Sequence, residues 1–129
     1  MGRIIILILM HAFGDFFLQG NKLSRLKALK MNYLIEHVGI YTGLFIILSP
    51  LILGLTILQG LLFSLLNGSF HFVIDYFTGK YKLKYFDTNE SKYITTIGID
   101  HTLHIVILIG SYMYLFPNSL NNFTPFFKY

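Results

Sequence analysis

The chain alternates between long apolar stretches and short polar segments rich in lysine. The apolar stretches cover residues 3–19, 33–49, 51–77 and 93–116. A helix that spans a bilayer needs about 20 apolar residues, so the last two stretches are long enough and the first two are at the lower limit. Lipid cannot satisfy the open edge of a strand, and helices are therefore expected throughout. The pattern predicts an all-α, integral membrane, four-helix transmembrane bundle that forms a single domain over residues 1–129.

Composition supports a membrane protein. Charged residues make up 12% of the chain and hydrophobic residues 54%, whereas soluble domains carry about 25% charged residues. Cysteine is absent, which excludes disulfides, thiolate metal sites and a cysteine nucleophile. The first stretch contains His11 and Asp15 and lacks a small-residue cleavage site, so we expect it to remain in the mature protein rather than to act as a signal peptide.

The polar connections carry most of the positive charge. The basic residues between the first two and the last two stretches are Lys22, Arg25, Lys27, Lys30, Lys80, Lys82, Lys84 and Lys92. The connection at Ser49–Pro50 is uncharged, and we expect a tight turn there because proline lacks the N–H that would continue a helix. The positive-inside rule then places both basic connections in the cytoplasm and both termini outside, in a multi-pass protein of the inner (cytoplasmic) membrane. Topology and membrane lipids account for the charge, so no nucleic-acid partner is expected.

Ionisable side chains inside the apolar stretches are costly and point to function. The stretches contain no lysine, so their aspartates are expected to need a proton or a metal cation. Histidine and aspartate are paired at a spacing of four residues, one helical turn apart on one face, in His11/Asp15, His71/Asp75 and, reversed, Asp100/His104. The reversal fits the topology, since the aspartate lies nearer the cytoplasmic border in every pair.

These pairs and a histidine at the same depth in the second stretch predict a shared metal centre. The candidate ligands are His11, Asp15, His37, His71, Asp75, Asp100 and His104. They are too many for one tetrahedral ion, so two divalent ions bridged by an aspartate are expected. Nitrogen and oxygen donors without thiolate suit zinc first, with manganese or iron as alternatives. Residues one turn away that would orient ligands or meet substrate are Gln19, Tyr41 and Asn67; His101 and Glu36 have no assigned role.

Two further patterns are an internal repeat and a resemblance to a known family. The segment from His11 to Phe17 repeats weakly from His71 to Phe77 in the same direction, which is consistent with two similar helical hairpins. The motifs are His11-x-x-x-Asp15-Phe-x-Leu-Gln19, His37-x-x-x-Tyr41, Asn67-x-x-x-His71-Phe-x-Ile-Asp75 and Ile-Asp100-x-x-x-His104. With them the chain resembles, over nearly its whole length, small bacterial and phage membrane proteins of the domain-of-unknown-function family numbered 3307. His101 stands where glutamine is expected in that family.

The family resemblance implies no activity, but a looser likeness to membrane-bound metal-dependent hydrolases implies hydrolysis by analogy. We therefore expect a membrane-embedded hydrolase in which Asp15, Asp75 and Asp100 are catalytic and a metal-activated hydroxide attacks a lipid-linked or anionic phosphoester. One alternative is a transporter of divalent metal or protons, which the apolar outer half of the chain disfavours. Another is a structural metal site in a phage or bacterial assembly. The sequence leaves a homo-oligomer open.

Overall fold

The computed structural model describes residues 2–117, and every element in that range is helical. The elements are α1 (Gly2–Ala12), the π-helix η1 (Phe13–Phe17), α2 (Gly20–Leu26), α3 (Met31–Leu53), α4 (Ile57–Tyr85) and α5 (Glu90–Leu115). By length and composition α3, α4 and α5 could cross a membrane. The segment Gly2–Phe17 and α2 make a fourth candidate only if the two are counted as one span with a bend of 88°.

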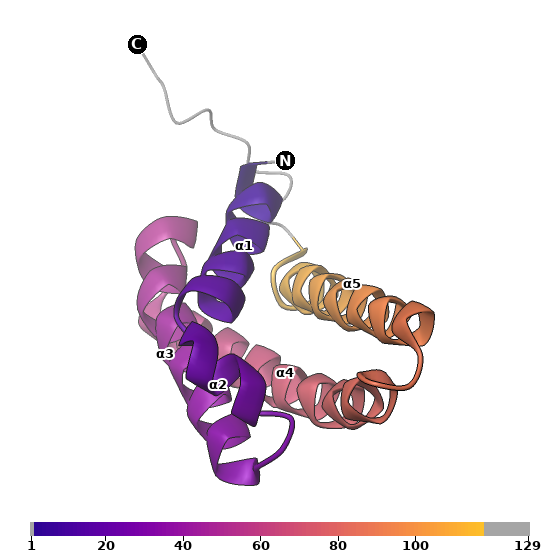
Figure 1. The fold of residues 1–129 in the computed structure, drawn as a ribbon. Coiled ribbons are helices and arrows are strands. Elements are labelled where there is room, and N and C mark those ends of the chain that lie inside the picture. Colours follow the sequence, from indigo (N-terminus) through magenta and orange to yellow (C-terminus); the bar gives the residue numbers. More distant parts are fainter. Residues whose placement is uncertain (1, 118–129) are drawn as a thin grey trace.

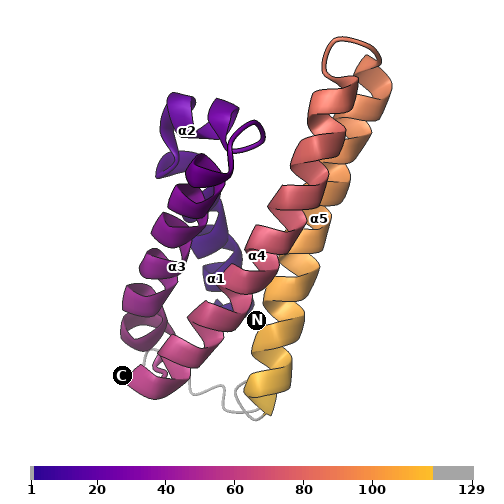
Figure 2. The ribbon, with the colours of Figure 1, turned by 90° about the horizontal axis from the view of Figure 1, so that it is seen from below.

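The helices form a ring around a mixed core. Helix α4 packs between α3 and α5, and α1 contacts both α3 and α5 on the opposite side (Figure 1). Helix α2 and the α4–α5 connection lie at one end, whereas the α3–α4 connection and the end of α5 lie at the other (Figure 2). Buried aromatic and aliphatic side chains, among them Phe45, Phe63 and Leu108, fill the half nearer the α3–α4 connection. The buried histidines and aspartates occupy the half nearer α2, whereas the buried Ser49 and Ser64 lie in the half nearer the α3–α4 connection.

The predicted turn at Ser49–Pro50 is wrong, because α3 continues through Pro50 to Leu53. The helix ends at Gly54, whose φ of +68° is a left-handed conformation that favours glycine. Helix α4 then begins after Thr56, which forms a capping box with Gln59. The ring of Pro50 has room inside the bundle because Gly60 faces it, and a Cβ on Gly60 would lie 2.8 Å from Pro50 Cγ. The third predicted helix therefore starts at residue 57 instead of 51.

The first predicted helix, 3–19, is also divided. After α1 the chain widens into η1, which contains Asp15, and π-helical turns of this kind are frequent at functional sites. Gly14 lets η1 approach α3, since a Cβ there would lie 3.0 Å from Tyr41 Cδ2. Gly20, at φ +58°, begins α2, which occupies a segment expected to be a loop. Helix α2 crosses the end of the bundle and brings the following residue, Lys27, over the buried aspartates.

Candidate metal centre

Buried histidines and aspartates from separate elements meet in the polar half of the bundle. Four of them form one group, in which one ligand atom from each residue lies within 4.8 Å of the others: Asp15 of η1, His37 of α3, and His71 and Asp75 of α4. A second group consists of Asp75, Asp100 and His104, so the two groups share Asp75. These buried groups could hold a metal ion.

The first group has the spacing of a tetrahedral site. The His37 and His71 Nε2 atoms are 3.0 Å apart. His37 Nε2 lies 3.1 Å from Asp15 Oδ1 and 3.2 Å from Asp75 Oδ2, and His71 Nε2 lies 3.6 and 3.5 Å from the same two oxygens. A tetrahedral zinc ion with bonds of about 2.0–2.1 Å needs donors about 3.3 Å apart. These five separations are close to that value, so the group could hold one such ion.

Beyond the four donor atoms of the first group, several buried atoms near Asp15 and Asp75 have no hydrogen-bond partner within residues 2–117. His104 Nδ1 donates to the Asp100 carbonyl oxygen over 2.8 Å, which leaves Nε2 free, 3.8 Å from Asp75 Oδ1. His11 Nε2 lies 4.0 Å from Asp15 Oδ2, and the His11 and His104 rings stack at 5.4 Å. Among residues 2–117, no hydrogen bond satisfies the buried His11 Nε2, His104 Nε2 or Asp75 Oδ1. Each such atom costs about 1–3 kcal/mol. His104 and Asp75 belong to the second group, which could hold a cation, whereas the predicted ligand His11 lies outside both groups.

Of the three residues expected to orient the ligands, Tyr41 contacts two of the predicted ligands, and Asn67 contacts Tyr41. The Tyr41 hydroxyl accepts a hydrogen bond from Asn67 Nδ2 over 3.0 Å and is 3.0 Å from His11 Nδ1. The Tyr41 ring also stacks on His71, with centroids 4.0 Å apart. A proton on His11 Nδ1, donated to Tyr41 Oη, would leave Nε2 of His11 as a ligand. Gln19 differs, because its buried Oε1 has no hydrogen-bond partner within residues 2–117.

The expectation that the aspartates lack basic partners is wrong. Lys27 Nζ donates to Asp75 Oδ2 over 2.9 Å and to Asp15 Oδ1 over 3.4 Å. Lys82 Nζ donates to Asp100 Oδ2 over 2.7 Å, and the Thr78 hydroxyl donates to Asp100 Oδ1. Both lysines start outside the buried layer and reach it through their long aliphatic stems.

Lys27 remains a cation beside these carboxylates. Burial acts to lower the pKa of Lys27, but the nearby Asp75 and Asp15 carboxylates more than offset this effect and raise the pKa. Lys27 Nζ is also 3.1 Å from His37 Nε2, so it contacts three of the four donor atoms of the tetrahedral group. From the sequence Lys27 is expected in a polar connection, and no spacing signal points to these contacts.

The two residues without an assigned role lie outside both ligand groups. His101 is partly exposed, stacks on Phe16 with centroids 5.1 Å apart, and has Nδ1 2.9 Å from the Ile97 carbonyl oxygen. Its Nδ1 is 3.7 Å from Asp100 Oδ2. Glu36 is exposed on α3. Neither position adds a ligand to the centre.

A cavity of about 230 Å³ reaches one of the shared ligands. Asp75 lines it together with Lys27, Lys30 and Lys80. Lys22 is outside its lining and lies over the Tyr33 ring, 5.7 Å from the centroid. Asp75 is thus next to a space bordered by positive charge.

Comparison with known proteins gives one match. No curated protein and no solved structure matches the chain. The family described as "Protein of unknown function (DUF3307)" matches residues 4–128 and so includes every candidate ligand. The family predicted from the His/Asp motifs is confirmed, and the chain belongs to the DUF3307 family.

Proposed function

We propose that this protein is a membrane-embedded, metal-dependent hydrolase that acts on an anionic phosphoester, lipid-linked or free. The observation that carries the proposal is the donor group of Asp15, His37, His71 and Asp75, which has tetrahedral spacing next to a lysine-lined cavity. A buried centre that serves catalysis needs both a metal site and access for substrate. This group and its neighbouring cavity supply candidates for both.

The proposed centre holds two divalent ions, with zinc as the first candidate. Asp15 and Asp75 each have one oxygen near His37 and His71. Their other oxygens lie near His11 and His104. Asp75 belongs to both ligand groups, so it would be available to hold both ions, and Asp15 would hold one of them. When bound, the ions would supply Lewis acidity and an activated water molecule, and one of Asp15, Asp75 and Asp100 would accept the proton of that water.

The lysines around the cavity favour an anionic substrate. Lys27, Lys30 and Lys80 line the space beside Asp75, and a wall of like positive charges attracts phosphate groups. Lys27 Nζ is 2.9 Å from Asp75 Oδ2, so its ammonium group can contact a phosphate oxygen at the centre. Lys27 is mostly shielded from bulk water, which strengthens its interaction, whereas Lys30 and Lys80 are exposed.

The proposed setting is the inner membrane, with the lysine-rich end of the bundle in the cytoplasm. Large apolar side chains are exposed around the outside of the helices, for example Leu9, Ile47, Leu58 and Val106. Exposed apolar surface on spanning-length helices is stable against lipid. Basic residues at one end fit the positive-inside rule. The substrate would then reach the centre from the cytoplasmic face.

A structural metal site is the second candidate, and one observation favours it. The four donors of the first group are all protein atoms, and they complete a tetrahedron without water. Structural zinc sites are closed in this way, whereas catalytic sites keep a position open. Metal content alone does not separate the two functions, so turnover has to be measured as well.

The test compares Asp75→Asn with Glu36→Gln, a change of an exposed carboxylate on α3. Each variant is purified in detergent, its zinc, manganese and iron contents are determined by mass spectrometry, and hydrolysis of bis(p-nitrophenyl) phosphate and of phosphatidic acid is followed. We expect metal and turnover in the wild type and in Glu36→Gln. Asp75→Asn should lose metal and at least about a hundredfold in turnover, more than an outer-shell change typically costs.

Each contrary result has a defined meaning. Bound metal without hydrolysis of either probe in the wild type would replace the hydrolase with the structural site. Wild-type protein without metal, even after zinc is added, would reject both functions. Equal losses in Asp75→Asn and Glu36→Gln would show that the buried layer has no special role.

A further inference from the structure

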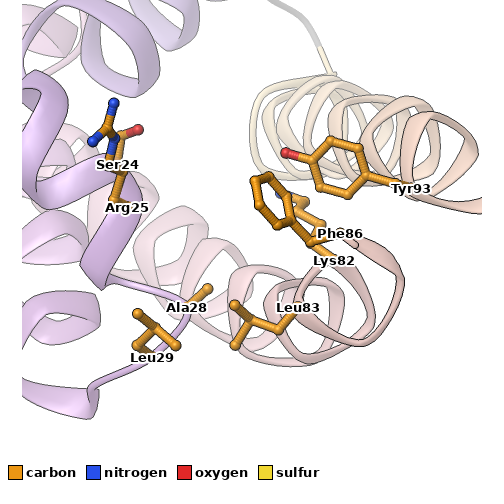
Figure 3. A pocket seen from close by; sticks show the side chains of 8 residues that line it. All are labelled: Ser24, Arg25, Ala28, Leu29, Lys82, Leu83, Phe86 and Tyr93. Carbon is orange, nitrogen blue, oxygen red and sulfur yellow. The ribbon is translucent and has the colours of Figure 1, made fainter. Parts of the chain in front are cut away.

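A second and larger cavity, of about 780 Å³, lies between α2, α4 and α5. Its lining includes Arg25 of α2, Leu29 of the α2–α3 connection, Leu83 of α4, Phe86 just after α4, and Tyr93 of α5. Lys82 of α4 also contributes to it. Figure 3 shows the α2 residues on one side of an open space and the residues of α4 and α5 on the other. The cavity therefore separates two parts of the chain that carry positive charge.

The charged groups of this cavity are all basic. Arg25 and Lys82 line it, and its lining, drawn from residues 2–117, contains no acidic side chain. The Arg25 guanidinium has no hydrogen bond or ion pair with another residue in that range. Lys82 Nζ donates one hydrogen bond to Asp100 Oδ2, and an ammonium group has three N–H donors. Both cations thus retain donors for an anionic ligand.

The remaining lining is apolar apart from Ser24 and the hydroxyl of Tyr93. Leu29, Leu83 and Phe86 border the space, and the Phe86 ring meets Tyr93 edge to face with centroids 5.4 Å apart. The volume lies within the range of about 300–1,000 Å³ that is usual for small-molecule sites. A free phosphate ion would leave most of this space unused. The lining therefore suits an anion that carries an apolar group.

Lys82 connects this cavity to the metal centre. Its ammonium group binds Asp100 Oδ2 over 2.7 Å, and Asp100 belongs to the second ligand group with Asp75 and His104. A phosphate held by Lys82 would therefore lie next to a ligand of that group. A phosphate bound in the cavity would thus be close to the proposed site of hydrolysis.

We propose that this cavity binds a phosphate ester with an apolar substituent, whose phosphate contacts Arg25 and Lys82 and whose apolar part lies against Leu83 and Phe86. The planar guanidinium of Arg25 suits two phosphate oxygens at once. The identification of this ligand as the substrate rests on the hydrolase function proposed above. The binding itself does not depend on turnover.

The experiment measures binding by titration calorimetry on the full chain in phosphatidylcholine nanodiscs, with EDTA present so that metal-bound phosphate does not contribute. The two probes are inorganic phosphate and a short-chain phosphatidic acid. Arg25→Gln is compared with Lys84→Gln, which removes the same charge from α4 outside the cavity lining. We expect Arg25→Gln to weaken phosphatidic acid binding by about tenfold, the equivalent of one charge-assisted hydrogen bond. Lys84→Gln should change it by less than about twofold, because distant charges are screened.

The outcomes separate the ligand sources and the two proposals. Arg25-dependent binding of phosphatidic acid alone identifies a lipid phosphate, and Arg25-dependent binding of both probes shows that the phosphate group suffices; either result supports the site. Equal weakening in Arg25→Gln and Lys84→Gln, or binding of neither probe, overturns it. Arg25-dependent binding by a wild-type protein that hydrolyses nothing would reject the hydrolase and retain this site. Partial recovery in Arg25→Lys would distinguish loss of charge from loss of the bidentate contact.

Discussion

Lys27 is the cation at the centre of the buried layer. Its ammonium group lies 2.9 Å from Asp75 Oδ2, 3.4 Å from Asp15 Oδ1 and 3.1 Å from His37 Nε2. Two carboxylates this deeply buried are stable only with a partner of opposite charge. Because a divalent ion would be bound by the same three atoms, Lys27 and the ion are alternative sources of positive charge for the aspartates.

This relation predicts how Lys27→Met behaves. With EDTA present, the variant should lose about 3–5 kcal/mol in free energy of unfolding, because the change leaves buried carboxylates without a cation. Zinc should restore most of the loss by supplying the charge. The measurement is denaturant unfolding in detergent with and without zinc, and Lys22→Met, an exposed change on α2, is the control. An equal loss under both conditions would mean that zinc does not reach Asp15 and Asp75.

The residue types of the centre were predictable from sequence, but their cations were not. Spacing of four residues indicates which histidine shares a helix face with which aspartate, so the pairs His11/Asp15 and His71/Asp75 could be named in advance. The position of Lys27 depends instead on the direction in which α2 crosses the bundle. A long side chain from a separate segment leaves no periodic signal, and the expectation of unpartnered aspartates failed for this reason.

At the scale of the elements, the contact between Pro50 of α3 and Gly60 of α4 sets how closely these helices pack. A Cβ on Gly60 would lie 2.8 Å from Pro50 Cγ and 2.9 Å from Pro50 Cδ. The pyrrolidine ring is rigid and cannot rotate away, so any side chain at this position has to move the helices apart. Gly43, also on α3, has no atom within 4 Å of the position its Cβ would take.

We therefore expect opposite effects from two alanine substitutions. Gly60→Ala should lower the free energy of unfolding by about 1–3 kcal/mol, the usual cost of overpacking, in spite of a gain of about 1 kcal/mol in helix propensity. Gly43→Ala should be neutral or stabilising, since it gains propensity without a clash. Thermal unfolding of both variants in the same detergent provides the comparison. A stable Gly60→Ala protein would show that α3 and α4 are not held together at Pro50.

The helical class followed from the apolar stretches, whereas the boundaries depended on local chemistry that hydropathy does not report. The sequence predicts a turn at Pro50, but inside a packed bundle a facing glycine makes room for its ring. Helix α3 instead ends at Gly54, and α4 begins after the capping box of Thr56. The change from α1 to η1 was likewise invisible, because Phe13–Phe17 is as apolar as a regular spanning helix.

The whole molecule is divided into a polar and an apolar half. The ligand groups lie towards α2 and the α4–α5 connection, and Phe45, Phe63 and Leu108 close the core towards the α3–α4 connection. The cavity beside Asp75 and the larger cavity beside Lys82 are both lined by residues of the α2 end. A transport path would need polar groups through the apolar half as well. The division therefore favours a centre that is reached from one face.

The sidedness of that face is the last prediction. If the lysine-rich end lies in the cytoplasm, a membrane-impermeant maleimide added to intact cells should label Gly2→Cys but not Ser24→Cys or Ser91→Cys. The reason is that α2 and α5 carry Ser24 and Ser91 among the basic residues that the positive-inside rule retains in the cytoplasm. The native chain has no cysteine, so each variant reports a single position, and labelling after permeabilisation shows that every cysteine is reactive. Labelling of Ser24→Cys and Ser91→Cys in intact cells would invert the topology. The metal centre would then face outward, and a cytoplasmic phosphoester could not be its substrate.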